Sequence, residues 1–191
     1  RSANPENSYD LWTLPLNGQP PFEVVRTKFD ERDAQFSPDG KWIAYQSNES
    51  GRFEIYVQPF PGGGSKVQIS TDGGAQVRWS PRGKELFYVG LDDRLMSVSV
   101  VADFRKNTFR AGTPQSLFVT KIGGALQGVR RPQYVVSADG QRFLMNTLVD
   151  APASPLTLIL NWKPVPCGAT TDAHAPTSAG GREALAKFCV A

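Results

Sequence analysis

Apolar and polar residues alternate in short runs along most of this chain, and a period of two predicts β-strands rather than helices. The same order of strand run, turn and strand run occurs twice. Residues 9–16, a turn and residues 22–26 are matched by residues 53–60, a glycine-rich turn and residues 66–70. Two segments with the same order of strand, turn and strand indicate the same structural unit.

One turn sequence recurs in front of the strongest of these runs. Ser37-Pro38-Asp39-Gly40 returns as Ser80-Pro81-Arg82-Gly83 and, in weaker form, as Ser137-Ala138-Asp139-Gly140. Proline presets φ near about −65° at the second position of a β-turn, and glycine readily adopts a left-handed backbone at the fourth. Each copy therefore predicts a hairpin with a type I turn closed by a glycine bulge.

The spacing of these turns is typical of a β-propeller blade. Ser37 and Ser80 are 43 residues apart, inside the roughly 40–45 residues of a four-stranded blade. Ser80 and Ser137 are 57 residues apart, and we expect the excess to be a loop at residues 102–113, between strands at 94–101 and 114–120. The sequence predicts an all-β fold, a partial β-propeller of about three and a half four-stranded antiparallel blades.

The pattern divides the chain into three regions. Residues 1–8 are expected to be a linker or a truncated end, residues 9–163 to hold the blades, and residues 164–191 to be a flexible, disordered tail, because Pro, Gly, Ala and Thr replace the alternation there. The repeats are expected near residues 9–29, 30–70, 71–120 and 121–163, and the last of them ends with a strand at 156–162.

The charge and hydrophobicity of the sequence disfavour two classes of partner, nucleic acid and the interior of a membrane. The 21 basic and 18 acidic residues are spread along the chain, which disfavours nucleic acid, because a phosphate-tracking surface needs clustered Lys and Arg. No window approaches the roughly 20 apolar residues that cross a bilayer. Cys167 and Cys189 both lie in the tail, where an oxidising compartment would allow them to pair. Since Arg1 is not an initiator Met and no signal peptide is present, we expect a piece of a longer protein.

No motif predicts catalysis, a metal site or a cofactor. Asp39 and Asp139 are expected to stabilise their turns, since Arg82 occupies the same place in the middle copy. The signatures of a protein kinase and of a serine hydrolase are absent, and the only histidine, His174, lies in the tail. We therefore expect no enzyme activity in this chain.

Polar residues at the entry to each inner strand are the candidate binding residues. Asp33, Gln76 and Gln133 stand four residues before the turn serine, on the side of the strand expected to face the central channel. The alternate positions are apolar and are expected to pack against neighbouring blades. With the adjoining loop arginines, the channel-mouth candidates are Arg32, Asp33, Gln35, Gln76, Arg78, Arg130, Arg131 and Gln133. A solvated channel without a specific ligand is the alternative.

Four segments carry a resemblance to a known family. They are QFSPDGKWIAY at 35–45, EIYVQPFPGG at 54–63, FRAGTP at 109–114 and LNW at 160–162. With these segments the chain resembles the TolB-like propellers of the WD type, and it is most similar to the C-terminal propeller of bacterial serine/threonine protein kinases of the acidobacterial kind. The resemblance implies a parent propeller of six or so blades and supplies no catalytic residue, because the kinase chemistry of that family lies in a separate N-terminal domain.

The resemblance implies a non-catalytic binding or scaffolding module, the sensor-like C-terminal part of a kinase, in a periplasmic or extracytoplasmic location. A protein or small-molecule ligand at the channel is the expected partner. The alternatives are the propeller of a serine peptidase of the prolyl oligopeptidase type and a free periplasmic TolB-like protein. Because an open arc of blades exposes an apolar blade face, we also expect self-association through the open edges.

Overall fold

The computed structural model describes residues 2–4, 8–62, 64–103, 105–106, 108–126 and 132–149. The chain divides into two compact units, 1–150 and 151–191, and all the described residues belong to the first. The expected closing strand at 156–162 and the expected tail therefore lie outside the described residues. Within the described part, all regular structure is β-strand, and no helix long and apolar enough to span a membrane is found there.

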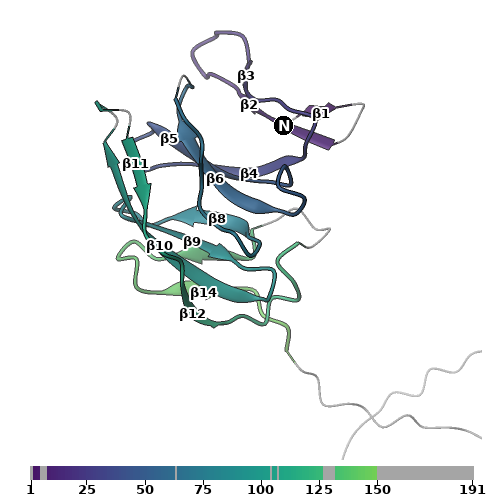
Figure 1. Cartoon of the computed structure of the whole chain (residues 1–191), viewed down its shortest axis with the longest axis vertical. Helices are drawn as coiled ribbons and strands as arrows, with labels where there is room; N and C mark the ends of the chain where they lie inside the picture. Colours follow the sequence, from purple (N-terminus) through teal and green to yellow (C-terminus); the bar gives the residue numbers. More distant parts are fainter. Residues whose placement is uncertain are drawn as a thin grey trace, which may run out of the picture. The chain divides into compact units, whose positions relative to one another are not determined.

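The described strands form antiparallel sheets that follow one another along the chain (Figure 1). The first sheet comprises β1 (Ser2–Asn4), β2 (Ser8–Thr13) and β3 (Phe22–Val25); the second, β4 (Glu31–Phe36), β5 (Trp42–Ser47), β6 (Glu54–Pro59) and β7 (Val67–Gln68); the third, β8 (Ala75–Trp79), β9 (Glu85–Val89), β10 (Arg94–Asp103), β11 (Thr108–Ala111) and β12 (Gln115–Val119); and the fourth, β13 (Tyr134–Val136) and β14 (Phe143–Met145).

The recurring turn has the predicted geometry in all three copies. Each glycine N–H donates to the carbonyl of its turn serine, at 2.8 Å for Gly40 and 2.9 Å for Gly83 and Gly140. The three glycines are left-handed, with φ of 69°, 67° and 74°. The serine hydroxyl oxygen also accepts the N–H of the residue five positions later, at 2.9 to 3.0 Å. The hairpin prediction is confirmed, and each hairpin is held by hydrogen bonds within its own turn.

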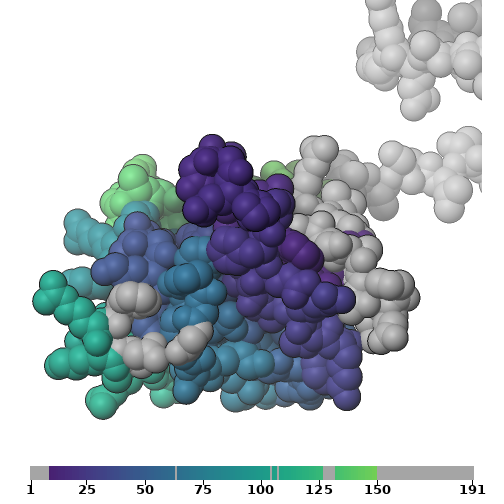
Figure 2. Space-filling view, turned by 90° about the horizontal axis from the view of Figure 1, so that it is seen from above, coloured from purple at the N-terminus to yellow at the C-terminus, as the bar shows by residue number. Residues whose placement is uncertain are grey.

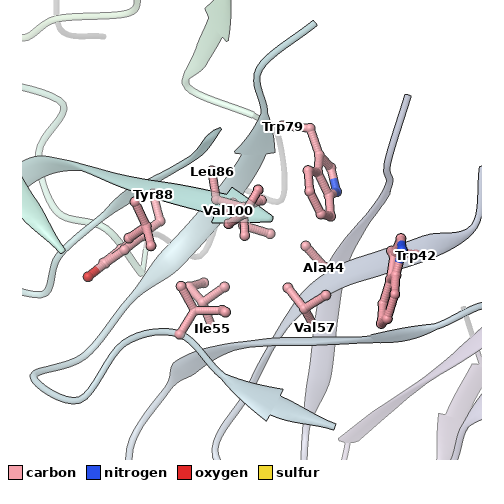
Figure 3. Close-up of a cluster of buried hydrophobic side chains, with 11 residues drawn as sticks. Trp42, Ala44, Ile55, Val57, Trp79, Leu86, Tyr88 and Val100 are labelled. Carbon is pink, nitrogen blue, oxygen red and sulfur yellow. The ribbon is translucent and has the colours of Figure 1, made fainter. Parts of the chain in front are cut away.

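Neighbouring sheets pack face to face, as the blades of a propeller do. β5 is buried along its whole length. Trp42 and Ala44 enter a cluster with β8, β9 and β10 of the third sheet (Figure 3), whereas Ile43 and Tyr45 enter a cluster with Leu11 and Val25 of the first sheet. In Figure 2 the first sheet (purple) lies against the second (blue). The all-β fold with antiparallel, propeller-type blades is confirmed.

Two expectations differ from the structure. Residues 2–4, expected to belong to a linker, form β1, which pairs with β2 from Ser2 opposite Asp10 to Asn4 opposite Ser8. Of the apolar positions on the inner strands, Val77, Trp79 and Tyr134 are buried as expected. Ala34 and Phe36 are exposed, and the Phe36 side chain retains 54% of its accessible surface. These two side chains line a cleft in front of the first sheet, described below.

The insertion at residues 102–113 is a hairpin in place of the expected loop. β10 continues to Asp103 and pairs with β11, from Val100 opposite Ala111 to Asp103 opposite Thr108. The start of β10, on the same edge, pairs with β12, the fourth strand of the blade. The hairpin places the ring of Phe109 5.1 Å from that of Trp42 and 6.3 Å from that of Trp79. Phe109 therefore closes the outer end of the contact between the second and third sheets.

Replacing Phe109 with alanine should weaken this contact. We expect Phe109→Ala to lower the free energy of unfolding by about 2 kcal/mol, less than for a fully buried phenylalanine, because the ring is only partly buried. Chemical denaturation followed by tryptophan fluorescence measures the change. The neighbouring exposed variant Arg110→Ala is the control and should change stability by less than about 0.5 kcal/mol. Equal effects of the two variants would contradict the role given to Phe109.

Candidate functional site

Each of the two well-formed inner strands has a bulge where the channel-mouth residues lie. The register of β4 on β5 shifts between Arg32 and Gln35, and that of β8 on β9 shifts between Ala75 and Arg78. Asp33 and Gln76, which occupy equivalent places in the repeat, are left-handed with φ of 52° and 56°. Non-glycine residues adopt this conformation only at a cost, and a bulge re-aims the side chains around it. The repeat therefore maintains a strained feature at the mouth.

The two candidate glutamines, Gln76 and Gln133, form hydrogen bonds with each other. The side-chain amide of Gln76 donates to Oε1 of Gln133 at 3.0 Å and to the carbonyl of Ala125 at 2.9 Å, and its own Oε1 accepts the N–H of Gln133 at 3.1 Å. The N–H of Gln76 donates to Oε1 of Gln46 on β5 at 2.9 Å. Gln46, Gln76 and Gln133 thus form a glutamine ladder that joins the second, third and fourth sheets. With Gln76 only 7% exposed, the ladder holds blades together.

Arg32 is also engaged within the protein. Its guanidinium makes a two-point ion pair with Asp30, with Nε 2.7 Å from Oδ1. It also lies over two aromatic rings, at 5.1 Å from the centroid of Tyr9 and 5.2 Å from that of Phe53. Because Tyr9 comes from the first sheet and Phe53 immediately precedes β6 of the second, Arg32 clamps the two sheets. Its charge is compensated by Asp30.

Three candidates keep polar groups available. Arg78 lies over the ring of Tyr134 at 5.6 Å and donates to the carbonyl of Val77 at 2.6 Å, with no carboxylate partner in the part of the chain that the structure describes. Asp33 is exposed and has neither a hydrogen bond nor an ion pair among the described residues. The side-chain amide of Gln35 has none there either, although its backbone carbonyl accepts the indole N–H of Trp79 at 3.3 Å. Arg130 and Arg131 lie outside the described residues.

Asp33 and Gln35 border a cleft of about 300 Å³ between the first and second sheets, which we call the β2–β4 cleft. Its other lining residues are Leu11, Trp12, Thr13, Val24, Ala34, Phe36 and Ile43. The indole Nε1 of Trp12 is buried and has no hydrogen-bond acceptor among the residues that the structure describes. The cleft thus combines apolar walls with an exposed carboxylate. The sequence did not identify Trp12, because its place at the cleft depends on how the two sheets pack.

The cleft and the mouth offer polar groups suited to binding. Among the described residues no three His, Cys, Asp or Glu side chains gather to hold a metal ion. His174 lies outside the described residues. Asp39 and Asp139 accept hydrogen bonds from their own turn serines, and Oδ1 also accepts the N–H of Lys41 at 3.2 Å or of Gln141 at 3.0 Å. The turn-stabilising role expected for these two residues is confirmed.

Comparisons with known proteins give partial matches. No protein-family model matches the chain. An uncharacterized protein of Agrobacterium fabrum is 33% identical over 92 residues, which cover 46% of this chain and 31% of that protein. Among solved structures, TolB from Acinetobacter baumannii is 20% identical with a TM-score of 0.43, over 72% of this chain and 42% of that one.

Two further solved structures are similar. A protein from Bacteroides uniformis named as a 6-phosphogluconolactonase is 18% identical with a TM-score of 0.46, over 71% of this chain and 40% of that one. A protein from Agrobacterium tumefaciens named as TolB is 18% identical with a TM-score of 0.41, over 56% of this chain and 42% of that one. The chain thus spans less than half the length of each of these proteins.

Two buried carboxylates lie behind the mouth, at Asp10 and Glu31. Oε1 of Glu31 accepts hydrogen bonds from the hydroxyls of Thr27 at 2.5 Å and Ser47 at 3.4 Å. Among the described residues, Oε2 of Glu31 and Oδ1 of Asp10 have no hydrogen-bond partner. By contrast, both oxygens of Glu54 accept the N–H of Gly73. Burial raises the pKa of Glu31 above 4.5, and the negative charges of Asp10 and Glu49 add to that effect.

Neutralising Glu31 should stabilise the protein at neutral pH. Because folding raises this pKa, the folded state holds the proton more tightly, and stability falls as pH rises above the ordinary value of 4.5. We expect Glu31→Gln to raise the melting temperature at pH 7 by a few degrees and to flatten its decline between pH 5 and pH 7. Circular dichroism melting curves measure both effects. Glu23→Gln, at an exposed position, should change neither; an unchanged pH profile in Glu31→Gln would contradict the prediction.

Proposed function

We propose that this chain is a non-catalytic binding or scaffolding module whose ligand, a protein or a small molecule, is held at the channel mouth. The observation that supports it is the set of uncommitted polar groups on the inner strands. Asp33 and Gln35 border the β2–β4 cleft, and Arg78 occupies the place of Gln35 in the next repeat. An apolar cleft with a few polar groups free to orient a ligand is the usual form of a binding site.

In this proposal the glutamine ladder and Arg32 position the binding residues and do not contact the ligand. Gln76, Gln133 and Arg32 hold neighbouring sheets and so fix the spacing of the mouth. Binding residues on rigid, well-packed elements lose less entropy when a ligand binds. We assign ligand contact to Asp33, Gln35 and Arg78 and positioning to the three engaged residues.

We further infer that the parent protein is a bacterial serine/threonine kinase and that this chain is its sensor-like C-terminal part, lying outside the cytoplasm. The four resemblance segments support this inference, and three of them lie in or beside β4–β6 and β11. Sequencing the coding DNA upstream of Arg1 tests it. A kinase domain followed by one apolar span of about 20 residues would support it. A signal peptide and further blades would indicate a free TolB-like protein, and a hydrolase domain a peptidase.

Removing the free charges at the mouth should weaken ligand binding. Asp33→Asn keeps the shape and tolerates the left-handed backbone, and Arg78→Gln removes the cation. We expect each change to weaken a partner captured from a cell-envelope extract by about tenfold, because charged groups in a partly desolvated mouth contribute on the order of 1.4 kcal/mol. Biolayer interferometry with the recovered partner measures the change.

Arg94→Gln is the matched control for Arg78→Gln. Arg94 is exposed on β10 and lies 3.5 Å from Asp92 in a surface ion pair, which contributes little to stability. The control should retain wild-type affinity. Melting curves of all variants separate loss of binding from loss of folding. A partner that binds Asp33→Asn and Arg78→Gln as tightly as the wild type would remove the mouth as the binding site.

A further inference from the structure

A second cleft, of about 480 Å³, lies between two of the recurring turns, and we call it the turn cleft. One wall is the turn that begins at Ser37 and the other is the turn that begins at Ser80. The cleft is also lined by Trp42, Trp79 and the end of β10. Figure 3 shows the two indoles at one end of the buried cluster, with Tyr88 at the other. The turn cleft is therefore separate in its residues from the channel mouth and the β2–β4 cleft.

One position of the recurring turn carries a different side chain at this cleft. In the second and fourth sheets the third turn residue is an aspartate, Asp39 or Asp139, which accepts the hydroxyl of its turn serine. In the third sheet the same position is Arg82, which cannot accept a hydrogen bond. The Ser80 turn still closes through its backbone bond to Gly83 at 2.9 Å and through Ser80 Oγ, which accepts the N–H of Glu85 at 3.0 Å. Turn formation therefore does not require the arginine.

The cationic side chains on this wall have no partner within the part of the chain that the structure describes. Arg82 and Lys84 are both exposed, and neither side chain has a carboxylate or another hydrogen-bond partner there. The one carboxylate in the lining, Asp39, is occupied by the Ser37 hydroxyl at 2.6 Å and the Lys41 N–H. The wall therefore presents positive charge that calls for a negative partner from outside the cleft.

A third side of the cleft, formed by the end of β10, is apolar. Val101 on β10 lines it and is 71% exposed, and Trp42, Trp79 and Val100 lie behind. The two turns lie close together, since a Cβ on Gly83 would lie 3.4 Å from Cδ of Pro38. A pre-formed space with an apolar side and a cationic wall suits a chain that alternates apolar and acidic side chains.

We propose that the turn cleft binds an extended, acidic protein segment, whose carboxylates pair with Arg82 and Lys84 while an apolar side chain packs on Val101. The volume exceeds what a single inorganic anion fills. Two cations beside a carboxylate are too few to follow a nucleic-acid backbone, which needs a continuous basic track. The partner segment is thus defined by its chemistry, alternating carboxylate and aliphatic side chains.

Fluorescence anisotropy with a labelled peptide of alternating glutamate and leucine tests the proposal on the 191-residue chain. We expect saturable binding that weakens with added salt and at least about tenfold in Arg82→Asp and in Lys84→Gln. Arg82→Asp recreates the Ser-Pro-Asp-Gly turn found at Ser37, so it should melt at or above the wild-type temperature. Arg26→Asp, which makes the same change of charge at the residue after β3, should bind as the wild type does.

Several outcomes would overturn the proposal. They are no binding by the wild type, equal binding of a peptide of alternating glutamine and leucine, unchanged binding by Arg82→Asp, and binding of single-stranded oligothymidylate in preference to the acidic peptide. Asp33→Asn and Arg78→Gln, which test the channel mouth, should leave the peptide's affinity unchanged. The turn cleft and the proposed function can therefore fail independently.

Discussion

A four-stranded sheet with two apolar faces cannot bury both of them by itself. β5 shows this constraint most clearly, because Trp42 and Ala44 pack on the third sheet and Ile43 and Tyr45 on the first. β9 repeats the arrangement, with Leu86 and Tyr88 facing the second sheet and Phe87 and Val89 facing the fourth. The second and third sheets thus each pack between two neighbours. The glutamine ladder, the Arg32 clamp and the Phe109 side chain all lie at contacts between sheets.

The parts of the fold that could be predicted from sequence are those set by local chemistry. A turn with serine first and glycine fourth forms through contacts among its own few residues, so three copies of it, two of them with proline second, identified three hairpins. Their spacing identified the blade. The hairpin at β10 and β11 was not predicted. Its residues carry no strong turn signal, and its stability depends on Phe109 reaching Trp42 and Trp79, a contact between segments more than 29 residues apart in sequence.

The candidate site also has a part that the local sequence pattern predicted and a part that depends on packing between sheets. Alternation along the inner strands placed Asp33, Gln76 and Gln133 in equivalent positions, and the bulges at Asp33 and Gln76 agree with that. Alternation cannot reveal which polar side chains pair with each other across blades. Gln76 and Gln133 satisfy one another because two inner strands of neighbouring sheets lie side by side, and Arg32 is engaged because Tyr9 and Phe53 approach it from two sheets.

Departures from the repeat carry information that its regular positions do not. Four residues before the turn serine, the two glutamines bond to each other, and the residue that differs, Asp33, is exposed and unpaired among the described residues. At the third turn position, the two aspartates accept their own serines, and the residue that differs, Arg82, is again exposed and unpaired there. A repeat keeps a residue where every blade needs the same contact. At these two positions one blade departs from the repeat, its turn or strand still forms, and the new side chain is open to a partner. Asp33 and Arg82 each border a cleft.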